Sequence, residues 1–290
     1  MDASDLLERL SSGEAIGAVA WTRKPDQVVA ERSGTNTGPP NGWVLTGRPD
    51  PVVFGPVADV VIVPASIAGS PGSRELFVLE HPPESSRAVQ PAMDLTRSLG
   101  WLELEAAPAT LLASGEVGSP AGEGGVGVPA GDSAAFSSLA DRAAVAVSAE
   151  MLGAAQRVLD MTVQYAKDRV QFGRPIGSFQ AVKHRCADML VDVEGMRSAV
   201  YYAAWCIAAE SSDASSAASA AKIWCSEAAA RVMASGLQVH GGIGFTWEHD
   251  MHLFVKRAQL DQVSFGDTSW HHDRLAGMLR ALAEAGLPVM

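Results

Sequence analysis

The first candidate for ligand chemistry is a polar and aromatic run between two predicted helices. Residues 169–180 read RVQFGRPIGSFQ. Arg169 offers a planar guanidinium for a pyrophosphate or a carboxylate, Gln171 offers a donor and an acceptor, and Phe172 offers a face for stacking. These side chains have the chemistry to grip a nucleotide. The alternative is an ordinary corner between helices, in which Phe172 and Phe179 fill the core.

The second candidate is a glycine-rich run, residues 238–248, which reads QVHGGIGFTWE. Glycine lets a backbone approach another group closely, and the N–H groups of Gly241 and Gly242 suit phosphate oxygens. The run is not a dinucleotide-binding fingerprint, because its spacing differs from G-x-G-x-x-G and it follows a predicted helix. The alternative is a helix that ends in glycine, with His240 as a hydrogen-bonded core residue.

Both runs lie in a C-terminal half whose apolar pattern is helical. Apolar residues recur at three- and four-residue spacing, and capping residues precede the runs. The predicted helices are residues 136–170, Ser178 to about Ala209, Asp213 or Ser215 to Val239, Trp247 to about Val263, and a last one capped by Asp267 or Thr268. Long helices with short connections predict an antiparallel bundle over residues 131–290.

The N-terminal half has the texture of a β domain. Short apolar or alternating runs are interrupted by glycine and proline, which favours a small antiparallel barrel or sandwich over residues 1–130. The predicted strands are residues 16–22, 43–46, 57–64, 75–80 and 102–105. The glycine-rich stretch 112–132 predicts a linker. The expected fold class is therefore α+β, a small antiparallel β domain followed by a helical bundle.

Composition excludes several classes of protein. The chain has 290 residues and a net charge of −11, which opposes binding to nucleic acid because the basic residues do not cluster. Its 3 cysteines have neither C-x-x-C spacing nor a histidine at a metal-ligand offset, so we expect no metal site and a reducing, cytoplasmic compartment. No apolar stretch is long enough to predict a membrane span.

The two candidate runs, in this order and in a helical half, resemble the acyl-CoA dehydrogenases. The likeness extends from about residue 133 to the end, through DRVQFGRPIGSFQAVKHRCADML and QVHGGIGFTWEHDMHLFVKR. It is weaker in the β half, where GEAIGAVAWT, GWVLTG, ADVVIVPA and FVLE follow the order of the family. In that family a helical domain precedes a β domain and a four-helix bundle, and FAD lies at a subunit interface.

The resemblance implies a flavoprotein that desaturates an acyl-CoA thioester between its α and β carbons. It also implies that six residues hold the ADP half of an FAD whose flavin half lies mainly in a neighbouring subunit. These residues are Arg169, Gln171, Phe172, Gln238, Gly241 and Gly242.

Two departures from the family affect the flavin and substrate side. The chain opens close to the lead into the β domain, so we expect most of the N-terminal helical domain to be absent and a bulky substrate, such as a steroid-derived thioester, to find room. Residues 21–26 and 46–54 also lack the family's flavin-contacting Thr-Glu-Pro, Gly-Ser-Asp and tryptophan patterns.

A third departure concerns the catalytic carboxylate, which the family carries in an aromatic-Glu-Gly-Thr run. Matching that run on its glycine puts Phe265 in the Glu position, and matching on its threonine puts Gly266 there. A second position known in the family falls on Ala143. Asp267 is the nearest acid and the one candidate base, with the N-cap of the last helix as its alternative role. His271 and its neighbour are expected at the surface or an interface.

The hypothesis that follows is a subunit of a heteromeric acyl-CoA dehydrogenase. It resembles the non-catalytic subunit of actinobacterial steroid-degrading α₂β₂ enzymes, binding the ADP part of FAD while a full-length partner subunit supplies the catalytic Glu. Two alternatives stay open. One is a self-sufficient homo-oligomeric dehydrogenase with an atypical base, and the other is a flavin-free scaffold or regulatory subunit.

Overall fold

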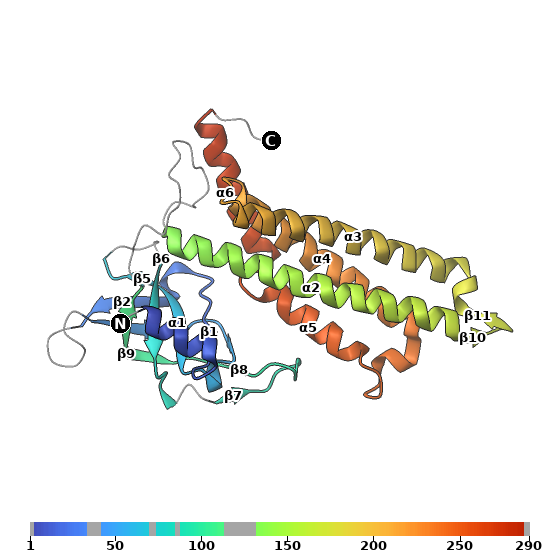
Figure 1. The fold of residues 1–290 in the computed structure, drawn as a ribbon, viewed down its shortest axis with the longest axis horizontal. Coiled ribbons are helices and arrows are strands. Elements are labelled where there is room, and N and C mark those ends of the chain that lie inside the picture. The colour runs from blue at the N-terminus through green and yellow to red at the C-terminus, as the bar shows by residue number, and fades with distance from the viewer. Residues whose placement is uncertain (1–2, 34–41, 70–73, 85–87, 113–131, 287–290) are drawn as a thin grey trace. The chain divides into compact units, whose positions relative to one another are not determined.

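The computed structural model describes residues 3–33, 42–69, 74–84, 88–112 and 132–286. These residues form two compact units (Figure 1). The β unit comprises the described residues up to 112 together with 132–139, and the helical unit comprises residues 140–286. The predicted linker, residues 112–132, lies outside the described residues except at its ends, and so does the predicted domain boundary at residue 130.

The β unit is built on a six-stranded sheet that closes on itself. Its strands are β1 (Gly17–Val19), β2 (Val28–Arg32), β3 (Trp43–Gly47), β5 (Val60–Ile67), β6 (Arg74–Glu80) and β9 (Leu104–Leu111). The order is β1-β5-β2-β3-β9-β6, and β6 also pairs with β5. Strand β6 lies along one edge of β5, and β1 and β2 share the other edge. Five strands, β5, β2, β3, β9 and β6, thus form a closed ring.

Most strand pairs are antiparallel, as predicted, but β1 and β2 both run parallel to β5. Parallel neighbours need a long connection, and the segment between β2 and β5 is long enough to contain β3 and the short strand β4 (Val52–Val53). Strand β4 joins β8 (Leu99–Gly100) and β7 (Val89–Gln90) in a second, antiparallel sheet. The sequence pattern missed β2, because only Val28 and Ala30 mark its buried face before the charged Glu31.

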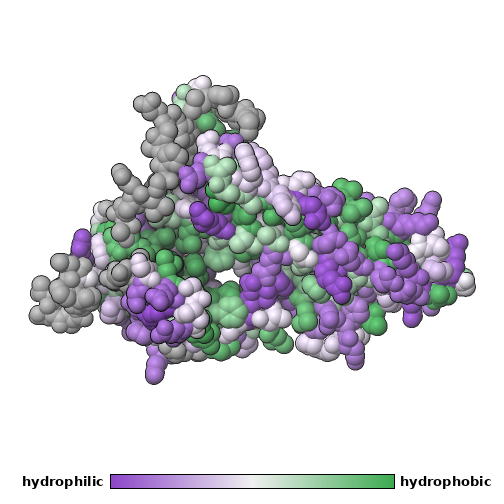
Figure 2. Space-filling model, in the orientation of Figure 1, coloured by the Kyte–Doolittle hydropathy of each residue, from purple (hydrophilic) through white to green (hydrophobic). Residues whose placement is uncertain are grey.

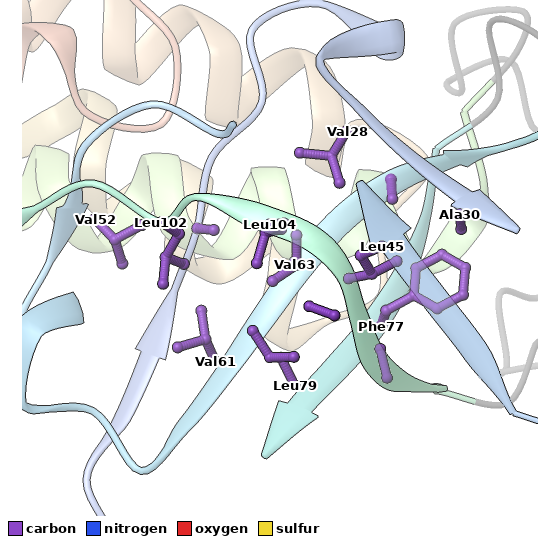
Figure 3. Close-up of a cluster of buried hydrophobic side chains, with 14 of the residues drawn as sticks. Val28, Ala30, Leu45, Val52, Val61, Val63, Phe77, Leu79, Leu102 and Leu104 are labelled. Carbon is purple, nitrogen blue, oxygen red and sulfur yellow. The ribbon is translucent and has the colours of Figure 1, made fainter. Parts of the chain in front are cut away.

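The interior of the closed sheet is an apolar core (Figure 3). Alternate residues of each strand point inward, as the period of a strand requires. Trp43 and Phe77 meet edge to face with ring centroids 5.5 Å apart. The fully buried aliphatic members of the cluster include Val28, Ala30, Leu45, Val61, Val63 and Leu102. Helix α1 (Ala3–Ser12) packs Leu6 against Val60 and Val78 at the edge of this unit.

The helical unit contains five helices at positions close to those predicted. They are α2 (Ala134–Asp168, which begins in the β unit), α3 (Gln180–Ala208), α4 (Ala214–His240), α5 (Met251–Val263) and α6 (Thr268–Glu284). Helices α2, α3 and α4 lie alongside one another in alternating directions (Figure 1). Helix α5 begins later than predicted, because Gly241–Phe245 forms a 3-10 turn and residues 246–250 form turns and bends.

Buried methionine, valine and alanine side chains fill the space between these helices, including Met151 of α2, Met196 of α3 and Val232 of α4. Apolar patches also reach the surface between polar ones (Figure 2). Tyr201 and Trp205 of α3, for example, are 67% and 59% exposed. None of the helices in the described ranges combines the length and apolarity needed for a membrane span.

A buried arginine ties the start of α2 to the sheet of the β unit. Arg74 of β6 donates two hydrogen bonds to the Asp132 carboxylate, at 2.8 and 2.7 Å, and one to the Thr22 carbonyl at 2.6 Å. Its guanidinium also lies 3.9 Å from the ring centroid of Phe136. The Arg74 and Asp132 side chains are 5% and 9% exposed, so each depends on the other for its charge partner.

Replacing Arg74 with methionine is expected to reduce the free energy of unfolding by about 3–5 kcal/mol, because it leaves the Asp132 carboxylate buried without its partner. Urea unfolding measures this loss. The matched control is Glu103→Gln in the same unit, which breaks an exposed pair with Arg48 whose side chains are 48% and 47% exposed. That variant should lie within about 0.5 kcal/mol of the wild type. An equal loss in the free energy of unfolding in the two variants would contradict the stabilising role of the buried Arg74–Asp132 pair.

Candidate functional site

The two candidate runs meet at one end of the helical unit. Helix α2 ends at Asp168, just before the first run, and α4 ends at His240, inside the second (Figure 1). The rings of Tyr165 and His240 stack with their centroids 4.6 Å apart. Arg169 follows Tyr165 by one helical turn and Gly241 follows His240 directly, so this contact holds the two runs side by side.

The first run is a β-hairpin rather than a plain corner between helices. Strand β10 (Val170–Gln171) pairs with β11 (Arg174–Pro175), with Gln171 opposite Arg174. Phe172 and Gly173 form the two-residue turn, with φ of 53° and 76°. Left-handed backbone at both positions is typical of the tight turns that join two hairpin strands.

The hairpin presents the predicted ligand-binding side chains to solvent. Phe172 is 92% exposed and meets Phe179 edge to face, with ring centroids 6.1 Å apart, so the alternative in which it fills the core is wrong. Within the described parts of the chain, no acceptor engages the Arg169 guanidinium, which is exposed. The Gln171 amide donates to the Val170 carbonyl at 2.9 Å, and the residue is exposed.

The second run combines a helix end with open space. Gly241 caps α4 with φ 63° and ψ −141°, a conformation that residues with a Cβ avoid, and its N–H donates to the Leu237 carbonyl. A Cβ built on Gly241 or Gly242 would meet no described atom within 4 Å. Gln238 is exposed on the last turn of α4. The surroundings of both glycines are therefore open to a ligand.

His240 has the structural role expected as the alternative. It is 4% exposed, and its Nδ1 lies 2.8 Å from the Gly236 carbonyl, which fixes the proton on that nitrogen. Burial lowers its pKa, and the nearby His249 lowers it further. A neutral His240 is thus a stacking and positioning residue for the two runs.

The one candidate base lies away from this site, at the turn between α5 and α6. Helix α5 starts after the glycine run and carries the chain through 13 residues, about 20 Å, before that turn. The Asp267 carboxylate accepts a hydrogen bond from the Trp270 amide at 2.9 Å and caps α6. Asp267 therefore has the capping role predicted as its alternative, and the structure does not bring it together with Arg169.

Backbone geometry at Gly266 favours one of the two matches to the family's catalytic run. Gly266 has φ 94°, and a Cβ there would lie 2.7 Å from a ring carbon of Trp270. Glycine is the residue that fits this position without strain, which agrees with the match on the family's glycine, the one that puts Phe265 in the Glu position. Phe265 is half-buried and packs against the core of the helical unit. Position 265 thus holds an apolar anchor.

We expect Gly266→Ala to destabilise the protein by roughly 1–3 kcal/mol, because it combines a strained backbone with a side-chain clash. The control is Gly277→Ala, in the exposed middle of α6, where a Cβ meets nothing within 4 Å. That change should be neutral or stabilising by about 0.5–1 kcal/mol, since alanine favours helix. Thermal unfolding followed by circular dichroism compares the two. Equal melting temperatures would show that the turn tolerates a side chain.

His271 is buried, which corrects the expectation that it lies at the surface. It is fully buried beneath the α5–α6 turn, and its Nε2 lies 3.1 Å from the Phe265 carbonyl. Burial, with the positive charge of Lys222 as the next cause, lowers its pKa to about 3. Lys222, a lone lysine in an alanine-rich helix, is also fully buried, and the sequence reasoning missed it.

Because the pKa of His271 is lower in the folded state than in the unfolded chain, the unfolded chain binds more protons between about pH 6.5 and pH 3. Its contribution to stability is therefore present above pH 6.5 and is lost on acidification, by up to about 1.4 kcal/mol per pH unit. Urea unfolding at pH 7 and pH 5 should show a shallower pH dependence for His271→Gln than for the wild type. Identical slopes would contradict a buried, neutral His271.

Comparison with known proteins identifies the class to which this two-unit α+β fold belongs. Residues 134–279 match the C-terminal domain of acyl-CoA dehydrogenases. Acyl-CoA dehydrogenase FadE27 of Mycobacterium tuberculosis is 32% identical over 280 residues, covering 94% of this chain and 68% of FadE27. The chain therefore belongs to the acyl-CoA dehydrogenase family, which confirms the resemblance and the fold class predicted from the sequence.

Other relatives share parts of the chain or its fold. IpdE2 of Mycobacterium tuberculosis is 54% identical over 116 residues, which is 40% of this chain and only 35% of IpdE2. The solved ChsE4-ChsE5 complex from the same organism matches 97% of this chain and 69% of its own, with a TM-score of 0.76 and 30% identity. A Tcur3481-Tcur3483 steroid ACAD structure has a TM-score of 0.80 at 27% identity, covering 97% of this chain and 72% of its own.

Proposed function

We propose that this chain is a subunit of an FAD-dependent acyl-CoA dehydrogenase and that its helical unit binds the ADP half of an FAD shared with a partner subunit. The observation that carries this proposal is the unengaged Arg169 guanidinium beside two glycines with open surroundings. A full-length family member, as partner, supplies the catalytic Glu.

The side chains at this end of the helical unit fit a dinucleotide. Arg169 carries a planar, permanently charged fork that suits a pyrophosphate, and Gly241 and Gly242 let phosphate oxygens approach the backbone. The exposed face of Phe172 suits a purine ring. Gln171 and Gln238 add amide groups for polar contacts. Every one of these groups binds or orients.

Bound FAD supplies the hydride acceptor for desaturation, and the residues of this chain supply the hold on its ADP half. Proton removal needs a carboxylate within about 3 Å of the reacting carbon. Phe265 and Ala143, the two positions matched to family bases, have no titratable group, and Asp267 caps a helix. This division between nucleotide binding and proton transfer supports a heteromeric enzyme over a self-sufficient one.

The relatives support the partner and the substrate class. The ChsE4-ChsE5 structure is a complex of two differently named chains, and the Tcur3481-Tcur3483 structure is a steroid ACAD. We therefore propose an α₂β₂ assembly that acts on a bulky, steroid-derived acyl-CoA thioester.

Arg169→Ala tests the role of the helical unit. In a complex purified after co-expression with a full-length family partner, the variant should bind FAD about 10- to 100-fold more weakly, because it loses a charge-assisted hydrogen bond. The ratio of flavin absorbance at 450 nm to protein absorbance reports the loss. The control is Arg157→Ala, an exposed arginine on the same helix, which should keep the wild-type flavin content.

Undiminished flavin content in Arg169→Ala would refute the proposed site, and a colourless wild-type complex would favour the flavin-free scaffold. The chain purified alone should be colourless. Flavin and turnover in the chain alone would instead favour the self-sufficient dehydrogenase.

A further inference from the structure

The turn between α5 and α6, residues 264–267, is held by hydrogen bonds from buried side chains. We call these four residues the α5–α6 corner. Phe265 and Gly266 have consecutive positive φ values of 54° and 94°, so the backbone here follows neither helix. Carbonyl groups in such a turn have no regular backbone partners, yet buried carbonyls require hydrogen-bond donors. The donors to these carbonyls are side chains of α4 and α6.

Lys222 of α4 supplies the first donors. Its ammonium donates to the carbonyls of Gln262 and Gly266, both at 3.0 Å, and to the Ser226 hydroxyl at 3.4 Å. An ammonium has three N–H groups, so these three acceptors satisfy it completely. Gln262 lies in the last turn of α5, where a cation also interacts favourably with the helix dipole. One amino group thus bridges the end of α5 and the residue before the cap of α6.

His271 of α6 supplies a further donor. Its Nε2 lies 3.1 Å from the Phe265 carbonyl, and because a carbonyl only accepts, this nitrogen carries the proton. Two corner carbonyls, those of Phe265 and Gly266, and the Gln262 carbonyl at the end of α5 are therefore bound by two fully buried side chains. Both side chains belong to helices that are separate from α5.

The charge of Lys222 is balanced on both sides of the corner. Asp261 of α5, which is fully buried, and Asp267, the cap of α6, both favour the ammonium, as does Cys225 of α4. Burial works against it and is the largest influence, and the pKa of Lys222 is lowered to about 8. His271 faces the same ammonium from α6. At pH 7, below the pKa of Lys222, the ammonium form with all its donors predominates.

We propose that Lys222 is a positioning residue, which fixes the α5–α6 corner, and with it position 265, in one backbone conformation. Matching the family's catalytic run on its glycine puts the Glu at position 265, so the lysine holds the backbone that would aim that acid, although this chain has Phe265 there. The inference rests on the contacts of the corner itself and is independent of the proposed hold on FAD. The corner lies at the C-terminal end of α5, whereas the proposed FAD site lies toward the glycine run that precedes α5.

Hydrogen–deuterium exchange of the full chain at pH 7 tests this role. Three amides report on the corner: Ser264, which donates to the Leu260 carbonyl, and Trp270 and His271, which donate to the carboxylate and the carbonyl of Asp267. In Lys222→Met, peptides containing these amides should exchange at least about tenfold faster than in the wild type, because the corner carbonyls lose their donors. Peptides from the middle of α2 should change by less than twofold.

The matched control is Ser226→Ala, which removes the third acceptor of Lys222 but leaves the Gln262 and Gly266 carbonyls bound, and it should exchange like the wild type. Lys222→Gln, which keeps two N–H donors without the charge, should restore part of the protection. If Lys222→Met does not fold, selective acceleration at the three amides in Lys222→Gln supports the proposal by itself. Unchanged exchange at the corner, or equal acceleration throughout the helical unit, would overturn it.

Discussion

The close approach of α4 to α2 is the constraint on which the arrangement of the helical unit depends. A Cβ on Gly236 would lie only 2.6 Å from Val158 Cγ1 and 3.3 Å from Thr162 Oγ1, so a larger residue would push the two helices apart. One turn further along, the rings of Tyr165 and His240 stack. A single glycine contact therefore places the hairpin after α2 beside the glycine run after α4, and two sequence motifs that lie about 70 residues apart become one surface.

Helices were predictable from the sequence because their signals are local. Asp267 was named as a cap, and α6 begins directly after it. The strands were harder to predict, since β2 has only two buried positions and its parallel pairing with β5 depends on a long connection that local patterns do not encode. The existence of β2 and its pairing partner therefore depend on neighbouring strands, which the local sequence pattern does not specify.

The residue types of the candidate site were predictable from the sequence, but which side chains are exposed and which are buried was not. Phe172 had two interpretations from sequence, a stacking face or a core residue, and only its place at the tip of a hairpin separates them. His271 was wrongly expected at the surface or an interface, because it was judged only from its place beside a second histidine on the helix. Its burial depends on the corner carbonyl above it, which comes from outside its own helix. A contact of this kind requires the tertiary fold.

Among the described residues, the charged groups that bear on the fold and the site are of two kinds: buried groups that are paired, and an exposed group that is not. Arg274 and Asp141 are buried together, with the guanidinium 2.5 Å from the carboxylate, and Ser215 donates to the same acid. Arg74 and Asp132 form an equivalent pair in the β unit. Such pairs are expensive to desolvate and destabilising to break, so they fix structure. Arg169, by contrast, stays hydrated and available, which is the state that ligand binding requires.

The closed ring of the β unit also bears on self-association. A strand with an unpaired edge is a template for adding strands from other molecules, which leads to aggregation. In the described part of the six-stranded sheet, β6 and β9 each have neighbours on both sides, and β5 has β6 on one edge and β1 and β2 on the other. The strand left at the margin, β1, spans only three residues. Strand addition from another molecule would find little backbone to pair with at β1.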